Sequence, residues 1–243
     1  MNKNIIIASI LSLGFVIGLT IVGQAFKHRN QSDNTVSVTG LGSKTFTSDL
    51  ITWQGNFSNN SMELNAAYAQ LANDKKIIHE YLTSKGIAEK EIIFSAVDIQ
   101  KTYNYGTDEY GRSYSSFSGY LLSQNVSIES QEVEKIEQLS RNITEIINQG
   151  IEFTSSAPQY FYTKLSEVKH EMIADATKDA KIRAEKIAEN AGSRLGKLKK
   201  ANTGVIQITA PNSNEDYSYG GTFNTYSKEK EASITIRLEY QLE

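Results

Sequence analysis

Tyrosine is the residue type in this chain of 243 residues whose spacing points most clearly to chemistry, and that chemistry is recognition of a partner. Tyrosines gather with glycine and serine in two polar stretches, the first tyrosine segment (103–117) and the second tyrosine segment (211–230). A tyrosine side chain offers a large contact area at a small entropic cost, and binding surfaces are enriched in it. The candidate residues of a partner or assembly surface are Tyr105, Tyr110, Tyr114, Tyr217, Tyr219 and Tyr226. The alternative is a pair of ordinary long loops whose rings fold back on a sheet.

Acidic side chains lie in the same two segments, at Asp108–Glu109 and at Glu215–Asp216. Calcium prefers such oxygen ligands, but their spacing does not match the loop of an EF-hand. We interpret them as solvated loop acids. The three histidines are far apart in the sequence, which favours surface or packing roles over metal ligation. The sequence therefore predicts no metal site.

No motif of a known catalytic or cofactor site occurs in the chain. Cysteine is absent, which excludes disulfides, thiolate nucleophiles and cysteine-ligated zinc. The chain has no GxxxxGK[ST], no HExxH, no GxGxxG after a strand and no GxSxG. We therefore predict a protein that is not an enzyme and holds no cofactor. The alternative is an enzyme with a site that these motifs do not reveal.

The charge balance argues against nucleic acid as a partner. The net charge is −3, from 25 basic and 28 acidic residues, whereas general polyanion binders carry a basic excess. Residues 175–200 do hold 8 basic and 4 acidic residues, but no aromatic side chain on which a base could stack lies among them. We interpret this stretch as a structural helix and predict no nucleic-acid partner.

The N-terminal region predicts a membrane segment. Residues 5–26 carry no charge, and as a helix they would be about 33 Å long, enough to cross the hydrocarbon core. We expect a tail at 1–4, a transmembrane anchor at 5–26 and a linker at 27–34. Small residues at Gly23 and Ala25 allow a different outcome, which is cleavage near Ala25 and secretion. The apolar run is longer than that of most signal peptides, which favours the anchor.

The remaining residues, 35–243, predict one domain in which strands and helices alternate. Residues 232–242 show the clearest strand pattern, with apolar side chains at the even positions and polar ones at the odd positions. We expect strands at 35–42, 49–58, 92–103, 118–128, 198–209 and 232–242, with a further strand in 151–165 that Pro158 interrupts. Helices are expected at 61–85, 131–148 and 166–191. The predicted fold class is α+β, with antiparallel sheets packed against about three helices in β-β-α units.

The third predicted helix has an apolar stripe rich in alanine. Small side chains would let it lie close to a sheet, and its charges alternate in sign as on a solvated face. We expect the stripe to be buried and to consist of Ile173, Ala176, Ala180, Ala184, Ile187 and Ala191.

The same helix carries a resemblance to a known family. The sequence DATKDAKIRAEKIAENAGSRLGKLKKA resembles the signature helix of the SIMPL-domain family. VSVTGLGSKTFTSDLITWQGNFS resembles that family's opening hairpin, and SGYLLSQNVSIES its Gly-Tyr strand. IINQGIEF is similar to its helix-to-strand junction and EASITIRLEYQL to its closing strand. These stretches follow one another in the family's order over nearly all of 35–242.

The resemblance implies a bacterial envelope protein, secreted or anchored, with links to oxidative-stress defence. At least one family member forms a ring-like oligomer, and the family has no established catalytic residues to carry over. The long tyrosine segments depart from the family pattern, so the size of an oligomer does not transfer.

Taken with the apolar N-terminus, the resemblance predicts a non-catalytic, membrane-anchored envelope protein that acts by oligomerisation or binding, in stress protection. We expect a single pass through the bacterial inner membrane, with residues 35–243 in the periplasm. Lys27 and Arg29, directly after the span, count against this orientation under the positive-inside rule. The expected partners are the membrane, through residues 5–26, and a second copy of the chain; the sequence does not identify a small-molecule ligand.

Overall fold

The computed structural model describes residues 12–24 and 34–243. The predicted tail at 1–4 lies outside these residues, and so do parts of the predicted membrane span at 5–26 and most of the predicted linker at 27–34. Residues 12–24 are helical, and their side chains are exposed. Within the described ranges, no helix is both long and apolar enough to cross a membrane.

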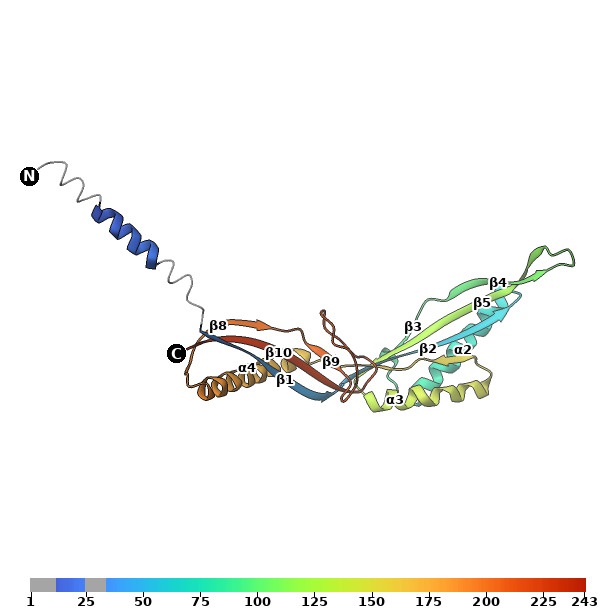
Figure 1. Cartoon of the computed structure of the whole chain (residues 1–243). Helices are drawn as coiled ribbons and strands as arrows, with labels where there is room; N and C mark the ends of the chain where they lie inside the picture. The colour runs from blue at the N-terminus through green and yellow to red at the C-terminus, as the bar shows by residue number, and fades with distance from the viewer. Residues whose placement is uncertain (1–11, 25–33) are drawn as a thin grey trace, which may run out of the picture. The chain divides into compact units, whose positions relative to one another are not determined.

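From residue 34 onward the chain alternates strands and helices (Figure 1). The strands of the first half are β1 (Thr35–Thr47), β2 (Leu50–Ser61), β3 (Ile92–Phe94), β4 (Asp98–Thr107) and β5 (Ser113–Ser130). Those of the second half are β6 (Phe153–Ser155), β7 (Gln159–Phe161), β8 (Leu195–Thr203), β9 (Gln207–Thr209) and β10 (Glu229–Leu242). The helices are α2 (Leu64–Ser84), α3 (Val133–Asn142) and α4 (Leu165–Asn190), with 3₁₀ turns at Glu89–Glu91 and Ile143–Gln149.

The strands form two sheets. One has the order β1-β10-β8 with β9 also paired to β10, and the other has the order β3-β5-β2-β6 with β4 on β5 and β7 on β2. Antiparallel pairing in these sheets confirms the predicted α+β class. The chain divides into two compact units: unit 1 holds the described residues up to Gly40 with Thr177–Thr203 and Ile236–Glu243, and unit 2 holds Leu41–Ala176 and Gly204–Thr235.

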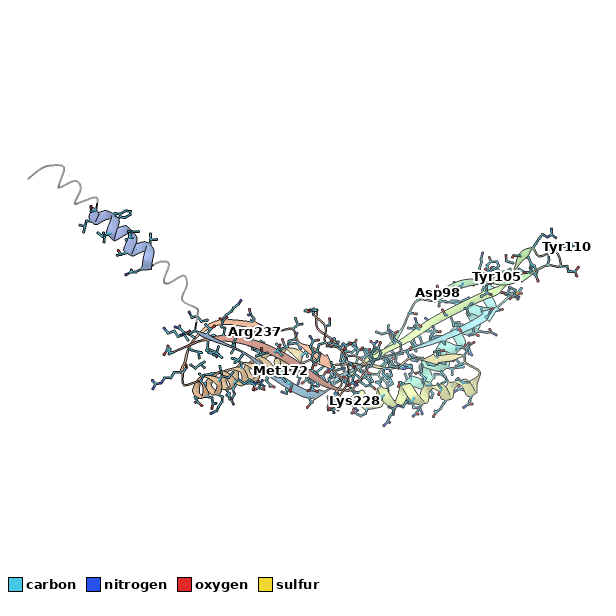
Figure 2. All side chains as sticks on the ribbon, in the orientation of Figure 1. Asp98, Tyr105, Tyr110, Met172, Lys228 and Arg237 are labelled. Atoms are coloured by element: carbon cyan, nitrogen blue, oxygen red, sulfur yellow. The ribbon has the colours of Figure 1, made fainter. Side chains whose placement is uncertain are left out.

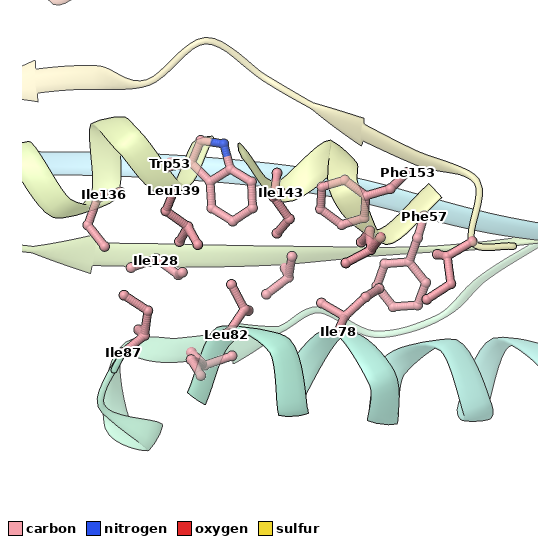
Figure 3. Packing of buried hydrophobic residues seen from close by; sticks show 14 of the residues in the cluster. Trp53, Phe57, Ile78, Leu82, Ile87, Ile128, Ile136, Leu139, Ile143 and Phe153 are labelled. Atoms are coloured by element: carbon pink, nitrogen blue, oxygen red, sulfur yellow. The ribbon is translucent and has the colours of Figure 1, made fainter. Parts of the chain in front are cut away.

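Unit 2 has a hydrophobic core between its sheet and the helices α2 and α3 (Figure 3). Ile51, Trp53 and Phe57 alternate along β2 and are buried, as their spacing predicts. The indole of Trp53 donates a 3.0 Å hydrogen bond to Ser155 Oγ, so its polar atom is satisfied although the ring is buried. Phe153 comes so close to β2 that a Cβ at Gly55 would lie 2.1 Å from its ring.

Three predicted elements of unit 2 are interrupted. The helix expected at 131–148 is α-helical only to Asn142 and continues as a 3₁₀ turn, which keeps Ile143 and Ile146 buried before Gly150 ends it at φ 83°. The strand expected at 92–103 divides into β3 and β4, because the chain leaves β5 after Phe94 and rejoins it at Asp98. The interruption predicted at Pro158 is confirmed, since β6 and β7 lie on either side of it.

Unit 1 consists of the start of β1, the end of β10, β8 and the second half of α4 (Figure 1). Ile236, Leu238 and Tyr240 are buried at alternate positions of β10, as predicted. The prediction of the buried stripe of α4 is partly wrong. Its buried line is Ala176, Ala180, Ala184 and Ala188, at a constant spacing of four, whereas Ile173, Ile187 and Ala191 are exposed. A constant spacing of four follows one ridge of the helix, which is inclined to the helix axis, so the buried face drifts away from the expected positions.

Candidate functional site

The second tyrosine segment is held in place by a buried lysine. The alternation of β10 turns its even positions inward, and Lys230 is in phase with them and 0% exposed. Its Nζ donates hydrogen bonds to the carbonyl oxygens of Asn224, at 2.5 Å, and Ser227, at 2.8 Å. One side chain thus binds the backbone of the segment at two points, three and six residues away.

Burial lowers the pKa of Lys230 to about 8, because removing the ammonium from water disfavours its charged form. The carboxylate of Glu215 opposes this shift by favouring the charge. Glu215 itself accepts a hydrogen bond from Asn224 Nδ2. Asn224 therefore hydrogen-bonds to Lys230 through its backbone carbonyl and to Glu215 through its side-chain amide.

Gln207 on β9 binds the other part of the segment. Its Nε2 donates to the carbonyl oxygen of Ser218 at 2.8 Å, and its Oε1 accepts from the backbone N–H groups of Ser218, at 3.2 Å, and Thr222, at 2.8 Å. Backbone bonds between Ile208 and the segment lie alongside. Because Gln207 is 9% exposed, these bonds are shielded from competing water.

These contacts hold two tyrosines at the rim of a hollow of about 340 Å³, the tyrosine pocket. Tyr217 is 70% exposed and Tyr219 is fully exposed. Ser233 Oγ lies 3.5 Å from the Tyr217 hydroxyl, at the outer limit of a hydrogen bond. The pocket is lined by Leu41, Gly204, Val205, Gln207, Tyr217, Ser218, Tyr219, Ser233, Ile234 and Thr235. The lining side chains are uncharged, so the arrangement suits binding by aromatic contact with a few hydroxyl groups at the edge.

The first tyrosine segment has a different structure, a two-stranded ribbon of β4 and β5 (Figure 2). Tyr103 pairs with Phe117 across the ribbon, with 5.9 Å between their ring centroids. Tyr105 and Tyr110 are 82% and 81% exposed. Asp108 closes the turn by accepting from the backbone N–H groups of Tyr110 and Arg112, and these hydrogen bonds hold the pKa of its carboxyl below the ordinary range.

The two tyrosine segments do not form one surface. Within unit 2, the second segment lies at the Leu50 end of β2, where Tyr160 N donates to Thr225 O at 2.7 Å and β7 pairs with β2. The ribbon extends past the other end of β2, because Ser61 pairs with Tyr120 and the residues before Tyr120 pair only with β4. β2 spans about 36 Å at 3.3 Å per residue. Tyr105, Tyr110 and Tyr114 therefore lie far from Tyr217, Tyr219 and Tyr226.

Of the six candidate tyrosines, the structure brings together Tyr217 and Tyr219 at the pocket. Tyr226 is exposed elsewhere on the second segment, where its N–H donates to Asn224 Oδ1 at 3.0 Å. The acidic pairs Asp108–Glu109 and Glu215–Asp216 do not join a cluster of metal-binding side chains in the part of the chain that the structure describes.

Lys230 and Gln207 were not predicted from the sequence. For Lys230 a signal existed, because a lysine in phase with the apolar positions 232–242 falls on the dry face of a strand. For Gln207 there was no such signal, since its partners are backbone groups 11 and 15 residues away.

A family model matches most of the chain. The model of the family described as SIMPL, protein of unknown function (DUF541), matches residues 36–240. No curated protein is significantly similar to the chain.

Proposed function

The chain belongs to the SIMPL family, and from that membership we propose that it is a non-catalytic protein of the bacterial envelope that acts by binding a second copy of itself. Residues 5–26 hold it in the inner membrane, and the domain lies in the periplasm. Its biological role is protection against oxidative stress, which follows from the family resemblance alone.

The observation that carries the proposal is the tyrosine pocket. Tyr217 and Tyr219 are exposed, yet the backbone that bears them is bound by Gln207 and Lys230. A surface that is ordered before binding loses little conformational entropy on association. Aromatic side chains on such a surface are typical of the centre of a protein interface.

The first test is the oligomeric state of the full chain in detergent, measured by native mass spectrometry. Tyr217→Ser with Tyr219→Ser removes the aromatic rim without changing the buried contacts, and we expect the oligomer to dissociate at least tenfold more readily. Tyr105→Ser with Tyr110→Ser is the matched control, since these tyrosines are equally exposed but lie on the ribbon. A wild-type chain that is a monomer, or an oligomer that survives the pocket substitutions, would contradict the assembly function.

The second test addresses the anchor. We expect the full chain to stay with membranes through an alkaline carbonate wash, and externally added protease to digest its domain in spheroplasts. Release by the wash would exclude the anchor, and protection of the domain in intact spheroplasts would exclude the periplasmic location.

The third test addresses the stress function. A strain that lacks the protein should survive peroxide less well than the wild type, and expression of the variant Tyr217→Ser with Tyr219→Ser should not restore survival.

A further inference from the structure

A second hollow, of about 370 Å³, lies in unit 1 and is polar. Five side chains line it: Ser37 of β1, Arg237 and Glu239 of β10, and Lys200 and Asn202 of β8. Arg237 lies opposite Asn202 in the antiparallel register, and Glu239 lies opposite Lys200. The hollow, here called the Arg237 hollow, is therefore a polar surface built across three adjacent strands (Figure 2, where Arg237 is labelled).

Hydrogen bonds orient the charged groups of the hollow. Arg237 Nε donates to Ser37 Oγ at 2.9 Å, which fixes the guanidinium and leaves its two terminal nitrogens for other acceptors. Thr35 Oγ1 donates to Glu239 Oε1 at 2.9 Å, which draws the carboxylate toward β1 and away from β8. Asn202 adds an amide that can donate beside Arg237.

The two cations of the hollow are not neutralised. Across residues 34–243, neither Arg237 nor Lys200 has a carboxylate oxygen within 4.0 Å. On α4, by contrast, Lys181, Arg183 and Lys186 each form an ion pair with an acid on the same helix. These three cations of the helix are therefore paired, whereas the two cations of the hollow have no ion pair, although the carboxylate of Glu239 lines the same hollow.

Unit 1 as a whole is basic in an acidic chain. Its residues 34–40, 177–203 and 236–243 hold nine basic and five acidic side chains, a net charge of +4, although the net charge of the chain is −3. Lys197 and Lys199 adjoin Lys200 on β8. A positive surface on a chain that is negative overall raises the local concentration of anions at that surface.

If residues 5–26 form an anchor, the few residues between the anchor and Ser37 keep this surface close to the bilayer. Ser37 is eleven positions after Phe26 in the sequence, and a chain extends by at most about 3.5 Å per position, so the reach is at most about 39 Å. The hollow can therefore touch the headgroups of the membrane that holds the chain. A bilayer surface that carries anionic lipids attracts lysine and arginine within a Debye length.

We propose that the Arg237 hollow binds the phosphate group of anionic phospholipids in the leaflet beside the anchor. This inference rests on the anchoring part of the proposed function. Arg237 presents its terminal nitrogens to two phosphate oxygens, Lys200 adds a point charge and Asn202 donates through its amide. The bound lipid fixes how unit 1 lies on the membrane, which an anchor alone does not.

The absence of cysteine gives a clean test in the full chain. Thr39→Cys, on the exposed face of β1 that also carries Ser37, accepts a fluorescent dye. The labelled chain is reconstituted in vesicles of phosphatidylcholine, with or without phosphatidylglycerol, that contain a lipid with a nitroxide on its headgroup. We expect phosphatidylglycerol to increase quenching of the dye and added salt to reverse the increase.

Substitutions identify the side chains that bind. Arg237→Gln with Lys200→Gln should lower the docked-to-undocked ratio roughly thirtyfold, since each cation near an anionic surface contributes about fivefold. Lys181→Gln with Lys186→Gln removes two cations that are already paired and should leave quenching unchanged. Quenching that does not depend on phosphatidylglycerol, or that survives the hollow substitutions, would overturn the proposal.

Two further arms separate the remaining outcomes. If inorganic phosphate changes the dye fluorescence in neutral detergent micelles as strongly as the anionic lipid does in vesicles, the hollow is a site for free phosphate and the lipid assignment is wrong. If the chain is lost from the vesicles in an alkaline carbonate wash, both the anchor and this inference fail. A chain that is retained but shows no lipid-dependent quenching refutes the inference alone.

Discussion

The two tyrosine segments have nearly the same composition, yet they are ordered in different ways. The ribbon at 103–117 is ordered by pairing of β4 with β5 and by contacts of neighbouring rings. The segment at 211–230 has little strand structure of its own and is ordered by the side chains of Gln207 and Lys230. Both present exposed tyrosines, but only the second presents two of them at a pocket.

Exposure of tyrosine therefore does not by itself mark a binding surface. In the ribbon, the backbone groups that face the neighbouring strand pair locally, and β5 continues from the ribbon into the sheet that holds the core. An irregular segment needs donors and acceptors from elsewhere, and here they come from buried positions of two strands. Buried polar side chains are costly unless they are fully paired, so their presence indicates that the geometry of the second segment matters.

The largest effect is expected from Gln207→Leu, which removes three hydrogen bonds to the backbone of Ser218 and Thr222 and takes away the acceptor of both N–H groups. We expect the free energy of unfolding to fall by about 3 kcal/mol, as measured by urea denaturation. The control is Gln100→Leu on the ribbon strand β4, where the side chain is exposed and bonds only to Asp98. Equal losses in the two variants would remove the distinction between the segments.

A smaller effect concerns pH and Lys230. Its pKa in the folded protein, about 8, lies below its ordinary value of 10.5, so between these values the unfolded chain binds more protons and stability rises with pH. The free energy of unfolding of the wild type, relative to Lys230→Met, should rise by about 1–2 kcal/mol from pH 8 to pH 10. Chemical denaturation at each pH measures it.

Lys101→Met on β4 is the control for this titration, since Lys101 is exposed on the ribbon. The free energy of unfolding of Lys101→Met should still rise from pH 8 to pH 10, whereas Lys230→Met should lose this rise. If the difference in free energy of unfolding between the wild type and Lys230→Met does not change with pH, Lys230 has an ordinary pKa and is reached by water.

The smallest effect is expected on the ribbon itself. Phe117 lies between the rings of Tyr103 and Tyr120, with centroids at 5.9 and 5.1 Å. Phe117→Ala should lower the free energy of unfolding by only about 0.5–1 kcal/mol, because a partly exposed aromatic pair contributes little more. Hydrogen exchange should quicken at 103–107 and stay unchanged at 218–226. Faster exchange in both stretches would mean that the two segments are coupled.

Much of the fold could be predicted from local patterns. The buried positions of β2 and β10 follow from period-two alternation, and the helices α2 and α4 follow from apolar spacing and their terminal glycines. The prediction is wrong at elements whose structure depends on contacts with residues distant in the sequence. The strand at 92–103 breaks because of its register on β5, and the stripe of α4 turns away from Ile187 because the helix follows one ridge along its partner.

The candidate site could be predicted only in part. The exposure of the six tyrosines agrees with their polar surroundings in the sequence. Their division into two separate groups does not follow from any local pattern, since it depends on which end of β2 each segment meets.

Local patterns were enough to predict the α+β class, the family, the alternating strands and the exposed tyrosines, because each of these depends on residues close together along the chain. The folded structure alone reveals that Tyr217 and Tyr219 share a pocket, that Lys230 and Gln207 hold them there, and that Arg237 and Lys200 lie together with no carboxylate oxygen within 4.0 Å of either. Each of those facts depends on the pairing of strands that are distant in sequence, and such pairing is selected by the free energy of the whole packed chain.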